Sequence, residues 1–378
     1  MARNFACLVT KNFAYWRKQT LLQQLFQRFC RNSASWRGMP KLAAVNVFST
    51  PFRKYQAAVC TELKKPLLIQ DIPASPLKPN EVRVDIHCCG VNLGDILSCQ
   101  GQYPEWPPLP FIPGMEFAGY VTETGTSVVS VKQGDRVLGF SPQKAMAEEC
   151  VIDHKFLWQV PQDVSFREAA ALPVSYGTAI AALHHRACTQ PGDTVLVTAG
   201  AGAAGLAALD IASNVLGAKV ITAAGSDEKC QLTLQRGAVA SINYRTQSIK
   251  EEVKKLTAKK GVNVVFDAVG GDIFMDAVSS LCWEGRVVIV GFAGGLIPSL
   301  PTNLLLLKNI AAVGVYWGGY PDENFTTFSD TICSAIRYCQ EGKIKPYIGG
   351  VYALHEVNEA FQYVLQRQST GKVVISVR

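Results

Sequence analysis

The chain has 378 residues, 48% of them hydrophobic and 18% charged, a balance typical of folded globular domains and not of bulk disorder. This length fits two domains better than one. The longest apolar runs, such as 310–317, are far shorter than a bilayer span, so no transmembrane helix is expected.

The net charge of +7 belongs to the start of the chain. Residues 1–53 hold nine of the 37 basic residues and none of the 30 acidic ones. The remainder, with 28 basic and 30 acidic residues, is nearly neutral. A basic surface that follows a phosphate backbone is therefore not expected, and we predict no nucleic-acid partner.

The basic segment has the features of a targeting sequence. It is rich in arginine, lacks a continuous apolar run before a secretory cleavage site, and has large apolar residues on one helical face: Leu21, Leu22, Leu25, Phe26 and Phe29. We predict a mitochondrial transit peptide over residues 1–53 and a location in the mitochondrial matrix. An uncleaved basic tail is the alternative.

The twelve cysteines are scattered, and no Cys-x-x-Cys pair occurs. This pattern does not match a zinc-binding lobe. In a reducing compartment most of them are expected to be buried thiols.

Two regions with different rhythms follow the basic segment. Residues 55–160 contain short strand-like stretches separated by prolines, such as 81–87 and 119–121. From Gly192 onward, strands alternate with helices that end at glycines 217, 237, 261 and 285. The predicted strands here are 194–199, 219–224, 262–268 and 286–291. This alternation predicts an α/β region with a doubly wound parallel sheet. Residues 322–378 are too few for a domain and are expected to complete the first one.

A glycine-rich turn follows the first of these strands. Its pattern is G-x-G-x-x-G, and it lies between an apolar strand and a helix, where a pyrophosphate could rest on free N–H groups. The residues expected to contact a dinucleotide are Gly200, Gly202, Ala203, Ala204 and Gly205. A plain tight turn is the alternative.

The end of the next strand bears on the choice of nucleotide. NAD sites place an acid there for the ribose 2′-hydroxyl, whereas this chain has Gly225 and Ser226. Lys229 and Tyr244 offer a cation and a hydroxyl to a 2′-phosphate. We therefore predict NADPH. Asp227 facing the ribose and Lys229 as an ordinary solvated helix lysine are the competing interpretations.

Several motifs in order resemble one family. They lie at 89–95 (Cys-Gly-Val-Asn-Leu-Gly-Asp), 114–119 (Gly-Met-Glu-Phe-Ala-Gly), 134–137, 200–205, 242–245 and 267–271. Together they resemble the medium-chain dehydrogenase/reductase superfamily, and within it the quinone oxidoreductase branch. The resemblance implies a GroES-like β-rich catalytic domain over 54–175, completed by 322–378. It also implies a Rossmann NADPH-binding domain over 176–321 and a homodimer formed through the apolar strand 310–317.

The resemblance also indicates chemistry without zinc. Asn92 stands where zinc-dependent members have a cysteine ligand, and Met115 stands where they have a histidine. Neither side chain is a usual zinc ligand, and the four cysteines of the structural lobe are missing. We therefore predict no metal. Cys89 beside this site is expected to be a buried, inert thiol.

By the same resemblance, Asn92 and Tyr103 are the expected catalytic residues. Tyr103 matches a tyrosine proposed as a proton donor in enoyl thioester reductases, although packing near Trp106 explains it equally well. His184 and His185 are expected to be structural. The positions expected near the nicotinamide or on the cofactor side are Thr178, Gly291, Phe292, Tyr316, Trp317 and Lys372.

These features predict an NADPH-dependent oxidoreductase that reduces quinones by hydride transfer, because an acceptor of this kind needs no metal to polarise it. Two alternatives stay open. The first is reduction of α,β-unsaturated carbonyls or enoyl thioesters with Tyr103 as the acid. The second is an NADPH-binding protein with little turnover.

Overall fold

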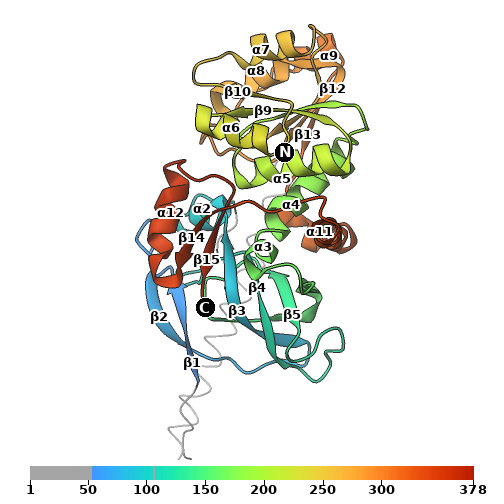
Figure 1. The fold of residues 1–378 in the computed structure, drawn as a ribbon. Helices are drawn as coiled ribbons and strands as arrows, with labels where there is room; N and C mark the ends of the chain where they lie inside the picture. The colour runs from blue at the N-terminus through green and yellow to red at the C-terminus, as the bar shows by residue number, and fades with distance from the viewer. Residues whose placement is uncertain (1–52, 105–106) are drawn as a thin grey trace, which may run out of the picture. The chain divides into compact units, whose positions relative to one another are not determined.

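A mixed seven-stranded sheet organises the first part of the chain and takes in the last strands as well (Figure 1). Its strands are β3 (Glu81–Val91), β4 (Glu116–Thr124), β5 (Arg136–Phe140), β6 (Glu149–Asp153), β7 (Leu157–Gln159), β14 (Ile348–Ala353) and β15 (Lys372–Ser376). Their order is β14-β15-β3-β4-β5-β7, and β6 pairs with β3. The computed structural model describes residues 53–104 and 107–378, so the predicted transit peptide lies outside the described residues except for Arg53.

The long strand β3 is the centre of this sheet. It pairs antiparallel with β15, β4 and β6, which brings Val373 opposite Val91 and Phe117 opposite Cys89. A separate hairpin of β1 (Lys54–Val59) and β2 (Leu68–Pro73) precedes it. Strand β15, which pairs with β3, thus comes from a segment almost 300 positions further along the chain.

The second sheet is entirely parallel. Its strands are β8 (Thr194–Val197), β9 (Lys219–Ala224), β10 (Ala240–Asn243), β11 (Val262–Asp267), β12 (Leu281–Ile289) and β13 (Ala311–Gly314), in the order β10-β9-β8-β11-β12-β13. The order reverses direction between β8 and β11, which is where α/β sheets of this kind bind ligands.

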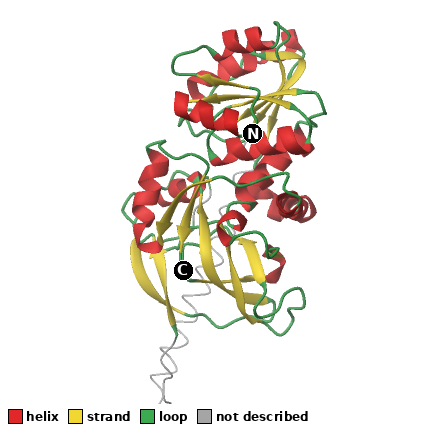
Figure 2. Ribbon diagram, in the orientation of Figure 1, coloured by secondary structure: helices red, strands yellow, loops and turns green. Residues whose placement is uncertain are grey.

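Both faces of the parallel sheet are covered, as Figure 2 shows by the helices around its strands. The helices of this region are α5 (Ala203–Asp210), α6 (Asp227–Gln235), α7 (Ile249–Leu256), α8 (Phe274–Ser279) and α9 (Thr302–Lys308). Val195 and Val197 face one hydrophobic cluster, which includes α5, while Leu196 between them faces another, which includes α7 and α8. This alternation is the signature of a doubly wound sheet buried on both sides. The predicted fold class, a GroES-like β-rich part with a Rossmann-type parallel sheet, is confirmed.

The remaining helices lie outside the parallel sheet's alternation. They are α2 (Leu93–Cys99), α3 (Phe166–Ala169), α4 (Pro173–Ile180), α10 (Tyr320–Glu323), α11 (Phe325–Gln340) and α12 (Val357–Leu365). Short 3₁₀ segments occur at η1 (His154–Phe156), η4 (Gly271–Ile273), η5 (Trp317–Gly319) and η6 (Leu354–Glu356), and π-helical ones at η2 (Ala181–Arg186) and η3 (Ile211–Val215). Across the described ranges, no helix combines the length and apolar character that crossing a bilayer requires.

Three local predictions need correction. The helix expected to end near Gly285 stops at Ser279, because Leu281 pairs with Val262 in the parallel ladder and Gly285 lies inside β12. The sequence spaces Ile249, Val253 and Leu256 as one apolar stripe on the helix before Gly261, but only the first two are buried, and Leu256 is exposed where α7 ends. The apolar strand predicted at 310–317 is only the four-residue β13.

Candidate active site

The glycine-rich turn joins β8 to α5 at the carboxyl end of β8, where the strand order reverses. A Cβ at Gly205 would lie 2.2 Å from the carbonyl oxygen of Ala199, and one at Gly200 would lie 2.7 Å from Cβ of Thr222. Both positions therefore need glycine for packing. At Gly202, the N-cap residue, an added Cβ would meet a single non-adjacent atom of the described residues within 4 Å, the Ala199 oxygen at 3.3 Å. The turn thus presents open backbone at the start of a helix, as an anion-binding site requires.

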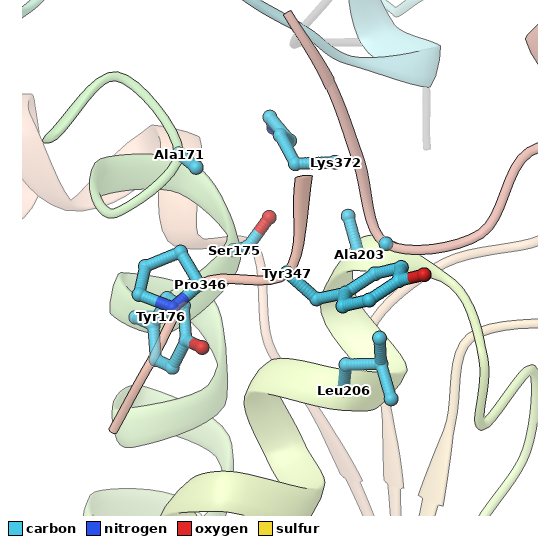
Figure 3. Close-up of a pocket in the computed structure, with 9 residues that line it drawn as sticks. Ala171, Ser175, Tyr176, Ala203, Leu206, Pro346, Tyr347 and Lys372 are labelled. Carbon is cyan, nitrogen blue, oxygen red and sulfur yellow. The ribbon is translucent and has the colours of Figure 1, made fainter. Parts of the chain in front are cut away.

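The C-terminal part of the chain returns to this turn. The Gly371 N–H donates to the carbonyl oxygen of Ala201 at 2.8 Å, and Gly202 and Gly371 form a parallel bridge. The next residue is Lys372. A small pocket here is shown in Figure 3, where Lys372 and Tyr347 lie beside the first residues of α5. Its lining residues are Ala171, Ser175, Tyr176, Ala203, Leu206, Pro346, Tyr347, Gly371 and Lys372.

The residues predicted to select the nucleotide lie together at the end of β9. A Cβ at Gly225 would lie 2.8 Å from the Tyr244 hydroxyl oxygen and 3.7 Å from Nε of Arg245. Ser226 caps α6, and its hydroxyl accepts a hydrogen bond from the Lys229 backbone N–H at 3.3 Å. Arg245 directly follows Tyr244, and the structure places its guanidinium beside this group.

Asp227, the acid that favoured the competing NAD interpretation, has a partner within the protein. Its Oδ1 accepts a hydrogen bond from Nδ2 of Asn243 at 2.7 Å, at the end of β10. The carboxylate therefore ties α6 to the neighbouring strand.

Lys229 lies in a cationic environment. Its ammonium donates to the carbonyl oxygen of Arg367 at 2.6 Å, and the side chain lines a second pocket together with Ser226 and Thr370. Partial burial lowers the pKa of Lys229, and the nearby charge of Arg245 lowers it further. A bound anion between the two cations would relieve this repulsion.

At the other end of the candidate site, Asn92 follows β3 and caps α2. Its Nδ2 donates to Oε1 of Glu116 at 2.9 Å, and its Oδ1 accepts from Nζ of Lys372 at 2.6 Å. Lys372 and Glu116 also form an ion pair, and both side chains are buried. The second carboxylate oxygen of Glu116 accepts from the backbone N–H of Val174, at the start of α4, at 2.8 Å. Thr178 lies one turn further along the same helix.

Glu116 was not predicted from the sequence. The available signal was an acid inside the apolar motif at 114–119, at a strand start where a charge needs a buried partner. The partner, Lys372, is 256 positions away, so no local pattern could identify it.

Asp95, in the first turn of the helix that Asn92 caps, is a second buried acid. Its two oxygens accept hydrogen bonds from the backbone N–H groups of Asn92 at 2.9 Å and of Gly114 at 3.1 Å. Burial raises the pKa of Asp95 to about 7, although these two donors and Lys372 favour its charged form. Asp95 therefore titrates near neutral pH, unlike an ordinary carboxyl group.

Tyr103 lies beside the first turn of α2. A Cβ at Gly94 would lie 3.3 Å from Cε2 of Tyr103 and 3.0 Å from Cε of Met115. The two side chains thus flank the helix that Asn92 caps. Trp106, the expected packing partner of Tyr103, lies outside the described residues.

The positions expected to close around the nicotinamide differ in exposure. Phe292 and Tyr316 are exposed, and Gly291 precedes Phe292 in the loop after β12. Trp317 is 4% exposed and packs against Phe140 and Phe328, with its Nε1 donating to Thr331 at 3.0 Å. The structure therefore gives Trp317 a place in the core.

The inert or structural roles expected of Cys89, His184 and His185 stay predictions. Cys89 is fully buried, and burial raises its thiol pKa well above the ordinary value. His184 and His185 stack edge to face in the π-helical segment after α4. Among residues 53–104 and 107–378, no group of three or more His, Cys, Asp or Glu side chains could hold a metal ion.

Family models match both the β-rich part and the parallel-sheet part of the chain. A family model described as alcohol dehydrogenase GroES-like domain matches residues 78–174, and one described as zinc-binding dehydrogenase matches residues 203–333. Quinone oxidoreductase-like protein 2 of Bos taurus is 63% identical over 326 residues, which cover 86% of this chain and 93% of that protein. Human quinone oxidoreductase is 30% identical over 310 residues, 82% of this chain and 92% of that protein.

Solved structures similar to this chain include proteins with related names. A mycobacterial protein solved in complex with NADPH has a TM-score of 0.79 and 29% identity, covering 85% of this chain and 99% of that one. The enoyl reductase CurK has a TM-score of 0.77 and 25% identity, covering 85% of this chain and 98% of that one.

Proposed function

The chain belongs to the medium-chain dehydrogenase/reductase superfamily of oxidoreductases, in its quinone oxidoreductase branch, and from this premise we propose that it is a zinc-independent NADPH:quinone reductase. The observation that carries the proposal is the group around Asn92. An amide bonded to a buried ion pair fills the place where zinc enzymes of the superfamily have a thiolate ligand. An amide and a thioether at Met115 are poor zinc ligands.

The cofactor that fits this chain is NADPH, which supplies a hydride when bound. Gly202 and its neighbours would hold the pyrophosphate, because the turn leaves backbone N–H groups open at the start of α5. Ser226, Lys229, Tyr244 and Arg245 would hold the 2′-phosphate, since they place two cations and two hydroxyls at the end of β9. A carboxylate that accepts from the ribose is replaced here by Gly225.

Hydride transfer without a metal favours acceptors that are already electron-poor. Quinones are of this class, because the electrons delocalise onto two oxygens and the product is aromatic. The test is steady-state oxidation of NADPH by the purified protein with 1,4-quinones, enones and enoyl thioesters as acceptors. We expect the highest kcat/KM with quinones. Binding of NADPH without turnover on any acceptor would make the chain a binding protein.

Reduction of activated double bonds is the second candidate. It rests on Tyr103, whose ring lies beside Gly94 in the helix capped by Asn92, and on the likeness to an enoyl reductase. A phenol there could protonate the enolate left by hydride addition. If this reaction is the physiological one, Tyr103→Phe would lower turnover of enones far more than turnover of quinones.

A symmetric homodimer is part of the proposal. In the described part of the chain, β13 is an edge strand of the parallel sheet and pairs with β12 alone. Just before it, Leu306 and Leu307 of α9 are exposed. Unpaired edges beside apolar side chains favour pairing with a second copy.

A mitochondrial location rests on the sequence of residues 1–53 alone. Fused to a reporter, this segment should direct it into the matrix, while a chain beginning near Arg53 should stay in the cytosol and still bind NADPH. A reporter that remains cytosolic would contradict the assignment.

A further inference from the structure

The carboxamide of Asn92 lies between two buried groups of opposite charge. Its nitrogen is 2.9 Å from a carboxylate oxygen of Glu116, and its oxygen is 2.6 Å from the ammonium of Lys372. Glu116 is 0% exposed and Lys372 is 3% exposed, so neither contact competes with bulk water. Both contacts are charge-assisted, which makes them stronger than hydrogen bonds between neutral groups.

The chemistry of the two partners fixes which way the amide faces. An ammonium only donates and a carboxylate only accepts. With the amide turned over, its NH₂ group would face the ammonium and its oxygen would face the carboxylate, so both contacts would become repulsive. The orientation of the Asn92 carboxamide is therefore set by Glu116 and Lys372 together.

The pair that sets this orientation is itself held in place. Glu116 accepts a second hydrogen bond from Val174 N–H, and the Asn92 backbone N–H donates to Asp95. Gly90 leaves room for the pair, because a Cβ there would lie 2.5 Å from Oε1 of Glu116 and 2.8 Å from Cε of Lys372. Strands β3, β4 and β15 and helix α4 thus converge on one amide.

Among the residues that the structure describes, one N–H of the amide has no acceptor. Nδ2 carries two hydrogens and Glu116 takes one of them, while the side chain of Asn92 is only half-buried. We propose that Glu116 and Lys372 are positioning residues that hold the second N–H of Asn92 ready to donate to the carbonyl oxygen of the hydride acceptor. This inference rests on the proposed reductase function.

The donated hydrogen bond acts where charge develops. The acceptor gains a hydride from the reduced cofactor, which is left oxidised, and the carbonyl oxygen conjugated to the attacked atom becomes an oxyanion that takes one proton from solvent. A fixed N–H donor stabilises this oxyanion without having to reorient during the reaction. In this proposal Glu116 and Lys372 act on the oxyanion through Asn92.

The test compares three variants with a matched control. Glu116→Gln removes the charge that selects the amide orientation. Asn92→Asp combined with Glu116→Gln exchanges the carboxylate and the amide, so that Lys372 keeps a carboxylate partner while position 92 loses its donor. Asn92→Ala removes the amide. The control is Glu149→Gln, which breaks another buried ion pair of the same sheet, with Arg83.

The readouts are resistance to urea, NADPH affinity, and kcat and KM with a 1,4-quinone. Glu116→Gln should lose stability and at least about 10-fold in kcat, with the affinity for NADPH unchanged. The exchange variant should regain most of that stability, yet stay on the order of 100-fold below wild type in kcat, and Asn92→Ala should show the same loss of kcat. Glu149→Gln should lose stability and keep its kcat.

Three results would overturn the inference: a wild-type kcat in Glu116→Gln, recovery of kcat in the exchange variant, or an equal loss of kcat in Glu149→Gln. Failure of the proposed function looks different, because wild-type protein would then bind NADPH and reduce no acceptor. In that case the urea resistance of the variants still tests whether Glu116 and Lys372 orient the amide of Asn92. An exchange variant no more stable than Glu116→Gln would show that the ion pair does not set the orientation of the Asn92 amide.

Discussion

The ammonium of Lys229 donates to the main-chain carbonyl of Arg367, 138 positions further along the chain, at 2.6 Å. The loop after α12 therefore lies against the residues that we assign to the 2′-phosphate. The guanidinium of Arg367 reaches the carbonyl oxygens of Ala293 and Gly294, in the loop after β12. The proposed nucleotide site is thus bordered by segments from three separate regions of the chain.

Lys229→Ala should weaken NADPH binding and spare NADH. Loss of one charge-assisted hydrogen bond to the phosphate corresponds to about 10- to 150-fold in affinity. NADH lacks this phosphate, so its affinity is the internal control, measured by fluorescence titration. Equal losses for both cofactors would limit Lys229 to supporting the loop through Arg367, and Arg245→Ala would be the next variant to measure.

Gly225→Asp should reverse the cofactor preference, because it places a carboxylate where the phosphate would bind and offers an acceptor to the ribose hydroxyl. Any side chain here must displace Tyr244, whose hydroxyl would lie 2.8 Å from the new Cβ. Gly225→Ala is therefore the matched control for crowding. The ratio of NADH to NADPH affinity should rise in the aspartate variant and change little in the alanine variant. Similar ratios in both would rule out the charge effect.

The buried carboxyl of Asp95 should make stability fall with rising pH. Its pKa of about 7 in the folded protein lies above the unfolded value of about 3.9, so the folded state holds a proton that the unfolded chain has released. This contribution is complete below the unfolded pKa and is lost as the pH rises through 7.

Asp95→Asn isolates this effect, since asparagine does not titrate. Between pH 5 and 7, the unfolding free energy of wild type minus that of the variant should decrease by up to about 1.4 kcal/mol per pH unit. Urea unfolding at several pH values measures it. A difference that stays constant from pH 5 to 8 would show that the Asp95 pKa is ordinary.

Purified protein should contain no stoichiometric zinc, and chelators should leave its turnover unchanged. The reason is the donor set at Asn92 and Met115, an amide already bonded to Glu116 and Lys372 and a thioether. Elemental analysis after gel filtration is the measurement. One zinc per chain would refute the assignment of these two positions.

The β13 edge should pair two copies of the chain. Light scattering at micromolar concentration should give twice the mass of one chain. Leu306→Asp with Leu307→Asp should produce monomers, because it puts charges on the apolar surface next to the edge. Leu256→Asp, an exposed leucine at the end of α7, is the control and should stay dimeric. A monomeric wild-type protein would exclude the dimer.

Local patterns predicted helices and strands well where a single residue determines the backbone conformation. Gly205 is needed because its helix packs on Ala199, and Gly237, with a φ of 104°, follows α6 as expected of a glycine stop. The same rule failed at Gly285, which pairing with β11 draws into a strand. Where a glycine can either end a helix or continue a strand, tertiary pairing decides.

The site was predictable only in part. Motif order predicts Asn92, Lys229 and Tyr244, which follow the ends of β3, β9 and β10, and their roles stay predictions. The contacts of Glu116 with Lys372, and of Lys229 with Arg367, join residues more than 130 positions apart. Such pairs depend on how the chain returns to the first sheet, which no local periodicity records.

The place of Lys372 in the last strand has a consequence for the order of assembly. During synthesis the parallel sheet can form early, because domains generally fold as units from the N-terminus onward. The first sheet gains β15 only after the strands of the parallel sheet have been synthesised, and Asn92 stays without its cation until then. A nascent chain that does not yet include β15 holds every glycine of the nucleotide turn and still has an incomplete site. A chain truncated before β15 would leave Glu116 as an uncompensated buried charge, which would destabilise the first sheet.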